Sequence, residues 1–180
     1  MKMGSDERKK YLLARLYACT GEIDEICKEL NLGDWTSYAR IKEIIASFAL
    51  GHRISDKFSG ADAINERKEE VEYKSTTGKN CKGSYTGISN QSTWSAMDNY
   101  LIEEKILKYP EHYFNRFDNS KLVESWMMTG QQVYDFIVPK VKRSYETRHR
   151  RKDSRSSGNV TWAEIKNNGT QIIKNGKRIK

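Results

Sequence analysis

Asp62, Glu72 and Lys74 are the residues whose types and spacing suggest chemistry. The run Val71-Glu72-Tyr73-Lys74 alternates apolar and charged side chains, which is the periodicity of a β-strand and puts Glu72 and Lys74 on one face. Residues 65–69 are polar and contain no β-branched side chain, so they favour a hairpin turn. A chain that folds back at this turn brings Asp62 close to Glu72 and Lys74.

Two carboxylates beside an ammonium group can bind a hard divalent cation and polarise a water molecule, as phosphodiester hydrolysis requires. We expect Asp62 and Glu72 to hold Mg²⁺, which Mn²⁺ should replace, with the backbone carbonyl of Tyr73 as a further oxygen ligand. Lys74 would position the attacking water and stabilise transition-state charge, because flanking carboxylates oppose its deprotonation. The simpler alternative is a surface salt bridge, since Glu-x-Lys is a common tripeptide.

The residues around these three positions resemble a known family. Gly-Ala-Asp-Ala-Ile-Asn at 60–65, followed by Val-Glu-Tyr-Lys-Ser-Thr at 71–76, is similar to the core of the PD-(D/E)xK nucleases, and specifically of type II restriction endonucleases. The similarity covers about residues 58–76, and Ala61 replaces the proline of the motif. It implies catalytic roles for Asp62, Glu72 and Lys74.

Many members of this family carry another acidic residue on the helix before the first strand, and Glu43 is the candidate here. The alternative is a surface glutamate paired with Lys42 or Arg40. The resemblance further implies Mg²⁺-dependent hydrolysis of double-stranded DNA at a short specific sequence. It also implies a symmetric homodimer, because a palindromic site matches a two-fold protein.

Periodicity predicts helices and strands in one mixed α/β domain over residues 1–180. The resemblance narrows this to a restriction-endonuclease-like core, a central mixed sheet flanked by helices at 52–145. A helical region at 1–51 would precede the core and a basic segment at 146–180 would follow it. The expected helices are 7–18, 23–30, 34 or 36 to 50, 92 or 93 to 108, and one after Gly130 whose end Pro139 should strain. The expected strands are 58–64, 70–75, 83–89, 113–117 and 122–128, with a hairpin at 170–180 and a mobile stretch at 154–158.

The first two expected helices, separated at Thr20-Gly21, resemble a helix-turn-helix, although helical hairpins are more often plain packing units. Their sequence leaves a contact with DNA or with a dimer partner open. The formal net charge is +8, and it is concentrated near the C-terminus. Residues 140–155 contain eight basic and two acidic side chains. This asymmetry favours a polyanionic partner, although a solvated basic loop is the plainer explanation.

Two groups of residues are candidates for DNA contacts. Those expected to contact phosphates or a groove are Arg148, Arg150, Arg151 and Lys152. Those expected to reach base edges, or alternatively to be loop and helix-cap residues, are Lys79, Lys82, Ser84, Tyr85, Asn90 and Gln91.

Other functions are less favoured. No apolar run reaches the length of about 18 residues that a membrane span needs, and residues 1–10 are charged, so we expect a cytoplasmic protein. The three cysteines are scattered, which favours reduced thiols over a zinc site. Two alternatives remain open: a repair or junction-resolving nuclease on the same core, and a non-catalytic basic DNA-binding module.

Overall fold

The computed structural model describes residues 5–37, 39–55, 60–150 and 155–179. The chain forms two compact units, Met1–Ile41 and Lys42–Lys180, and the organisation as one domain stays a prediction. Within the described ranges, no helix combines the length and apolar character that crossing a bilayer requires.

The first unit is dominated by α1 (Ser5–Glu29), a single helix of 25 residues. The expected break at Thr20-Gly21 is therefore wrong, and with it the helix-turn-helix that these residues resembled. The Thr20 hydroxyl donates to the carbonyl oxygen of Tyr17 at 2.7 Å, which satisfies it inside the helix. Gly21 weakens the helix by about 1 kcal/mol relative to alanine without ending it. The helix ends where Asn31 and Gly33 adopt positive φ angles of 51° and 74°.

The next helix, α2 (Arg40–Leu50), begins later than expected. Asp34 does not cap it, because the Asp34 carboxylate accepts hydrogen bonds from the backbone N–H of Thr36 at 2.9 Å and from the Ser37 hydroxyl at 2.6 Å. These bonds form a local turn before the helix. Gly51, at a φ of 72°, follows the last helical residue.

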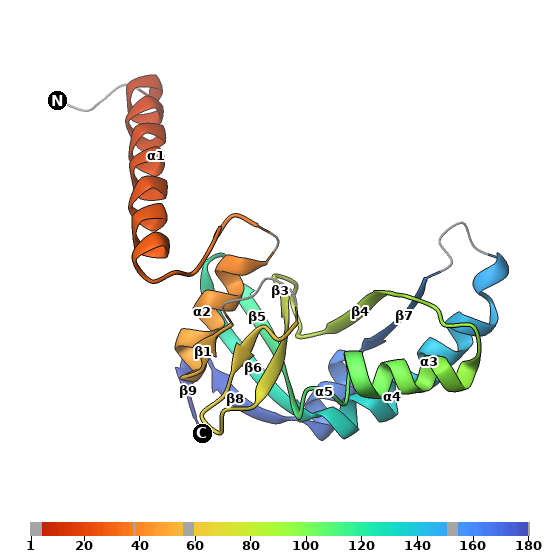
Figure 1. The fold of residues 1–180 in the computed structure, drawn as a ribbon. Coiled ribbons are helices and arrows are strands. Elements are labelled where there is room, and N and C mark those ends of the chain that lie inside the picture. The colour runs from red at the N-terminus through yellow and green to blue at the C-terminus, as the bar shows by residue number, and fades with distance from the viewer. Residues whose placement is uncertain (1–4, 38, 56–59, 151–154, 180) are drawn as a thin grey trace. The chain divides into compact units, whose positions relative to one another are not determined.

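The second unit is built on a seven-stranded mixed sheet in the order β1-β2-β3-β5-β6-β8-β9 (Figure 1). Its strands are β1 (Arg53–Ile54), β2 (Ala63–Ile64), β3 (Glu70–Thr76), β5 (Glu111–Asp118), β6 (Lys121–Thr129), β8 (Thr170–Lys174) and β9 (Lys177–Arg178). The β3–β5 pair is parallel and all other neighbours are antiparallel. The mixed α/β architecture is thus confirmed, and so is the terminal hairpin at Asn175-Gly176.

A parallel pair needs a long crossover, and the β3–β5 crossover contains three elements. It runs through β4 (Gly83–Ile88), α3 (Trp94–Tyr100) and the π-helical segment η1 (Leu101–Lys105). The Thr93 side chain caps α3 by accepting from the backbone N–H of Ala96 at 3.1 Å, in agreement with the expected helix start.

β4 pairs with β7 (Ser156–Val160) in a separate two-stranded sheet. The expectation of a mobile stretch at 154–158 is therefore wrong for the described residues, since Ser156–Gly158 lie in this strand. The Ser156 hydroxyl donates to the side chain of Asn90 at 2.5 Å, and the backbone N–H of Ser157 donates to the Ser144 hydroxyl at 3.2 Å. Side-chain bonds to neighbouring elements thus order a serine-rich segment.

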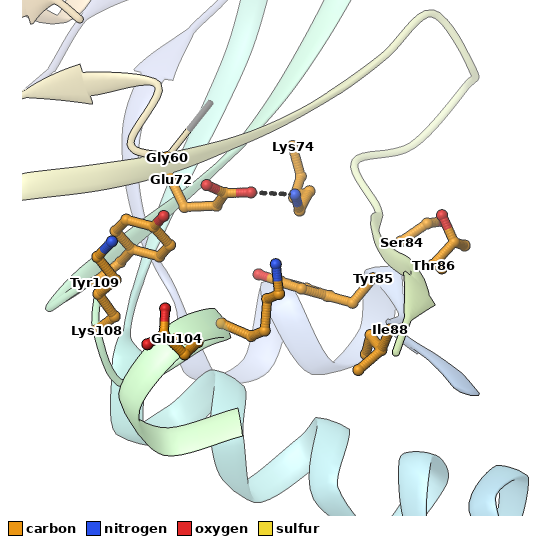
Figure 2. A pocket seen from close by; sticks show the side chains of 12 residues that line it. Gly60, Glu72, Lys74, Ser84, Tyr85, Thr86, Ile88, Glu104, Lys108 and Tyr109 are labelled. Carbon is orange, nitrogen blue, oxygen red and sulfur yellow. Dashed lines mark hydrogen bonds and ion pairs between the residues drawn. The ribbon is translucent and has the colours of Figure 1, made fainter. Parts of the chain in front are cut away.

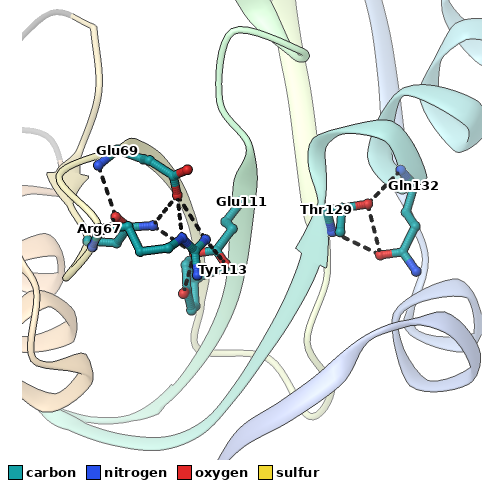
Figure 3. Close-up of polar contacts among 7 residues, drawn as sticks. Arg67, Glu69, Glu111, Tyr113, Thr129 and Gln132 are labelled. Carbon is teal, nitrogen blue, oxygen red and sulfur yellow. Dashed lines mark hydrogen bonds and ion pairs between the residues drawn. The ribbon is translucent and has the colours of Figure 1, made fainter.

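Three helical elements connect or follow these strands. Helix α4 (Gly130–Glu146) starts with a capping box between Thr129 and Gln132 (Figure 3) and continues beyond Pro139, so the expected strain at its end is wrong. A short 3-10 turn, η2 (Arg148–Arg150), follows it. Helix α5 (Trp162–Asn168) was not expected, although its Thr161–Glu164 capping box is a helix-start signal in the sequence.

The main sheet separates two hydrophobic clusters. Val71 and Tyr73 of β3 pack in one cluster with Ala46 and Leu50 of α2. Phe114 of β5 belongs to the other cluster, which contains residues of α3, α4, α5, β4 and β7. Because side chains alternate along a strand, Glu72 and Lys74 face the side of the second cluster.

A buried carboxylate clamps the turn between β2 and β3 onto the sheet. Glu111, at the start of β5, is 8% exposed. It accepts hydrogen bonds from Arg67 at 2.7 Å, Tyr113 at 2.8 Å and Asn65 at 3.1 Å, and Figure 3 shows Arg67 reaching across to it. These bonds hold the β2–β3 turn against β5. They therefore also fix the position of Asp62, the residue that precedes β2.

We predict that Gly83→Ala lowers the free energy of unfolding by about 1–3 kcal/mol, because it overpacks the core. A Cβ atom at Gly83 would lie 2.1 Å from Cε1 of the fully buried Phe114. Denaturant titration measures the change. Gly21→Ala is the matched control: nothing lies within 4 Å of its Cβ position, so it should raise stability by about 0.5–1 kcal/mol. Equal stabilities of the wild type and Gly83→Ala would contradict this packing.

Candidate active site

Asp62 lies immediately before β2 and is bonded to the neighbouring strand. Its backbone N–H donates to the carbonyl of Val71 at 3.1 Å, and its carboxylate accepts from the backbone N–H of Tyr73 at 2.6 Å. The expected hairpin is confirmed by the antiparallel pairing of β2 with β3, although β2 is shorter than the expected strand and residues 56–59 lie outside the described ranges. The carboxylate of Asp62 therefore lies against the backbone of β3 at Tyr73.

The surroundings of Asp62 are unfavourable to a negative charge. Burial is the main cause that raises the pKa of Asp62, to about 8, and the carboxylates of Glu72 and Glu43 add to it. Glu43, half-buried on α2, is thus close enough to act electrostatically on Asp62. Glu72 and Glu43 thus both lie within electrostatic reach of Asp62.

Lys74 balances part of this negative charge. Its ammonium forms an ion pair with Glu72, and the two side chains are 22% and 15% exposed. Nζ of Lys74 also lies 4.8 Å from the centroid of the Tyr85 ring, on whose electron-rich face a cation is stabilised. Figure 2 shows the Lys74 amine between the Glu72 carboxylate and this ring. Two independent contacts hold the amine in place.

Tyr85 is held in turn by a buried histidine. The Tyr85 hydroxyl lies 2.8 Å from Nδ1 of His112, and Nε2 of His112 lies 3.0 Å from the carbonyl oxygen of Ile106. A carbonyl only accepts, so Nε2 carries the proton, and Nδ1 accepts from Tyr85. Burial lowers the pKa of His112 to about 4, which keeps the ring neutral. A hydrogen-bonded chain therefore fixes the ring beneath Lys74.

Glu72, Lys74 and Tyr85 open into a pocket of about 430 Å³ between β3, β4 and η1, whose lining does not include Asp62 (Figure 2). Glu104, Lys105 and Lys108 form its opposite wall and were missed by the sequence analysis. They belong to a run of mixed charges that is typical of a solvent-exposed helix face. No pattern in the sequence predicts that this run lies opposite β3. The pocket thus carries further cationic side chains beside the Glu72–Lys74 pair.

The candidate DNA contacts are spread over several places. Ser84 and Tyr85 line the pocket, whereas Lys79 and Lys82 are exposed on the chain between β3 and β4. Asn90 accepts a hydrogen bond from Ser156.

A second group gathers around Tyr145, at the end of α4. The Tyr145 hydroxyl donates to the carbonyl of Gln91 at 3.1 Å, and the Arg148 guanidinium stacks 3.8 Å from the Tyr145 ring centroid. Arg150 is exposed, and Arg151 and Lys152 lie outside the described residues. Contacts of any of these residues with DNA stay a prediction.

The donor set suits a hard cation held by few protein ligands. In the part of the chain that the structure describes, no group of three or more His, Cys, Asp and Glu side chains is placed to hold a metal. Mg²⁺ commonly uses one or two carboxylates and completes its octahedron with water and substrate phosphate. Asp62 and Glu72 supply two carboxylates. Burial is the main cause of the raised pKa of Asp62, and a cation would relieve the repulsion by Glu72 and Glu43 that adds to it. The residues present therefore fit Mg²⁺.

Comparison with known proteins finds no family model that matches the chain and no match among the curated proteins.

We predict that acidification destabilises the protein through His112. Its pKa is lowered in the fold, so the unfolded chain binds a proton below about pH 6.5 that the folded protein refuses. The neutral His112 ring therefore contributes to the free energy of unfolding above pH 6.5. This contribution is lost as the pH falls toward 4, and the loss reaches about 2 kcal/mol at pH 5.

The measurement is denaturant unfolding of the wild type and His112→Gln at pH 7.5 and pH 5. The wild type should lose about 2 kcal/mol more than the variant between these values. His149→Gln, at an exposed position, should behave as the wild type. Parallel pH profiles for wild type and His112→Gln would contradict a buried neutral imidazole.

Proposed function

We propose that this protein is a Mg²⁺-dependent nuclease of the PD-(D/E)xK type, most similar in its site to type II restriction endonucleases. It would hydrolyse double-stranded DNA at a short specific sequence, as a homodimer in the cytoplasm, and accept Mn²⁺ in place of Mg²⁺. The observation that carries the proposal is the Asp62 carboxylate bonded to β3 beside the Glu72–Lys74 pair. The mixed sheet with helices on its faces is compatible with a restriction-endonuclease-like core.

Asp62, Glu72 and the carbonyl of Tyr73 would hold the ion. When bound, Mg²⁺ supplies positive charge to the phosphate oxygens and lowers the pKa of a coordinated water. One oxygen of Asp62 accepts from the N–H of Tyr73 at 2.6 Å, which fixes the carboxylate plane and leaves the other oxygen for the ion. The backbone thus pre-sets the geometry of the acidic ligand.

Lys74 would position the attacking water. Its ammonium has three N–H bonds, and one of them is donated to Glu72. The Tyr85 ring below the amine restricts its rotation, so a remaining N–H can point into the pocket at a water or at a phosphate oxygen. This arrangement would supply a fixed positive charge where negative charge grows in the transition state.

The cations around the pocket fit a polyanionic substrate. Lys105 and Lys108 line the wall opposite Glu72, and the basic C-terminal quarter adds charge for attraction at long range. A pocket of about 430 Å³ is the size of a small-ligand site. It would receive one phosphodiester unit, while residues outside it contact the rest of the duplex.

We predict that Asp62→Asn, Glu72→Gln and Lys74→Ala each abolish cleavage, with a loss of at least about a hundredfold in rate. The first two remove an ion ligand and the third removes the fixed charge. The assay is digestion of a sequenced plasmid with Mg²⁺, with and without chelator. Glu103→Gln is the control, because Glu103 is exposed on η1 and is not among the pocket-lining residues.

The wild type and Glu103→Gln should cut at discrete positions only with Mg²⁺. A wild-type rate in any of the three site variants would contradict the assignment. Binding of duplex without cleavage, and without an effect of Mg²⁺, would favour the non-catalytic DNA-binding module.

We predict that Mg²⁺ stabilises the protein more strongly as the pH rises. The pKa of Asp62 is raised in the fold, so the folded protein holds a proton that the unfolded chain has lost above about pH 3.9. Without metal, stability through this group is therefore present at low pH and falls as the pH rises toward 8. A bound cation takes the place of the proton.

Thermal unfolding with and without Mg²⁺ or Mn²⁺ at pH 6 and pH 8 measures this linkage. The gain in Tm should be larger at pH 8, and Asp62→Asn should lose most of it at both values. Glu103→Gln should keep the full gain. An equal gain in wild type and Asp62→Asn would show that the ion binds elsewhere.

A further inference from the structure

Helix α1 carries a regular apolar seam. Its members follow one another at alternating intervals of four and three residues, which is the heptad repeat of a coiled coil: Leu12, Leu16, Cys19, Ile23, Ile26 and Leu30. Leu30, one residue past the helix, still donates its backbone N–H to Ile26 at 3.0 Å. The helix is about 37 Å long at 1.5 Å per residue, long enough for three heptads.

The seam is exposed over much of its length. The exposed fractions are 47% for Leu12, 62% for Leu16, 53% for Ile26 and 61% for Leu30. An apolar stripe of this length on a helix is unfavourable in water, and it marks a contact surface.

The charges beside the seam indicate the orientation of a partner helix. At seven-residue intervals along one side lie Arg8, Arg15, Glu22 and Glu29, basic in the first half and acidic in the second. A parallel copy would set this column against Leu13, Thr20 and Cys27, five residues further on, which carry no charge. An antiparallel copy sets the column against itself reversed, so that Arg15 meets Glu22 and Arg8 meets Glu29 of the other helix.

We propose that α1 pairs antiparallel with α1 of a second copy of this chain. The column is complementary to its own reverse, so one surface serves both copies, and the resulting interface has two-fold symmetry. This proposal supplies a surface for the homodimer proposed above. The pairing of the helices is independent of the proposed nuclease activity. Its tests measure the molecular mass of the protein in solution and not cleavage of DNA.

The first test is sedimentation equilibrium of the full chain. The wild type should have twice the 20.9 kDa mass of one chain. Leu16→Lys and Ile26→Asp, each placing a charge in the seam, should weaken association by at least about tenfold in Kd. Tyr17→Ser is the matched control: Tyr17 is 83% exposed but lies outside the seam, so the variant should dimerise as the wild type does. Circular dichroism and a cooperative thermal transition confirm that each variant folds.

The second test exchanges charges. Arg15→Glu should weaken the dimer, and adding Glu22→Arg should restore it, whereas adding Glu29→Arg should not. A monomeric wild type would overturn the proposal. So would a dimer that survives Leu16→Lys, because the contact would then lie elsewhere, whereas the proposed nuclease activity would be untouched by that result.

Discussion

The partly buried carboxyl of Asp62 beside Glu72 is the constraint on which the site depends. Carboxylates so placed repel each other, and burial deprives Asp62 of the water that would stabilise its charge. The fold nevertheless keeps them together, through the N–H of Tyr73 on Asp62 and through the ion pair of Lys74 with Glu72. A stable protein retains such an arrangement at a cost, and we propose that a divalent cation relieves it.

Both sides of the main sheet contribute to that arrangement. On the side of α2, Val71 and Tyr73 are buried and set the alternation that turns Glu72 and Lys74 the other way. At the hairpin, the Glu111 clamp holds the turn that precedes β3. On the far side, β4 carries Tyr85, which His112 of β5 holds beneath Lys74. The position of the amine therefore depends on two strands besides its own.

The sequence predicted best where a short pattern decides the structure. Alternation in β3, the paired strands around Asn119 and the Asn175-Gly176 turn are local signals, and all three elements form. The break expected at Thr20-Gly21 failed because one glycine does not overcome a long run of helix formers. The expectation that Pro139 would strain the end of the helix was wrong for a related reason. Helix α4 buries Val133 and Ile137 before the proline and Val141 after it, and that packing outweighs one missing hydrogen bond.

Strand β7 and the wall of the pocket could not be predicted, because they depend on tertiary contacts that no local sequence pattern indicates. A serine-rich segment forms β7 because β4 lies beside it, and Glu104, Lys105 and Lys108 meet β3 only through the crossover. The proximity of Asp62 to Glu72 and Lys74 could be predicted because all three lie within one hairpin. The hydrogen bond between Tyr85 and His112 could not be predicted, because the two residues come from strands distant in the sequence and both residue types are common in protein cores.

We propose that Asp62 and Glu72 jointly bind one divalent cation next to the Lys74 amine. Anomalous diffraction from crystals of the protein grown with Mn²⁺ and duplex DNA tests it most directly. We expect a single strong manganese peak within coordination distance of oxygens of both Asp62 and Glu72. Full occupancy of the duplex without a manganese peak between these two carboxylates would contradict it.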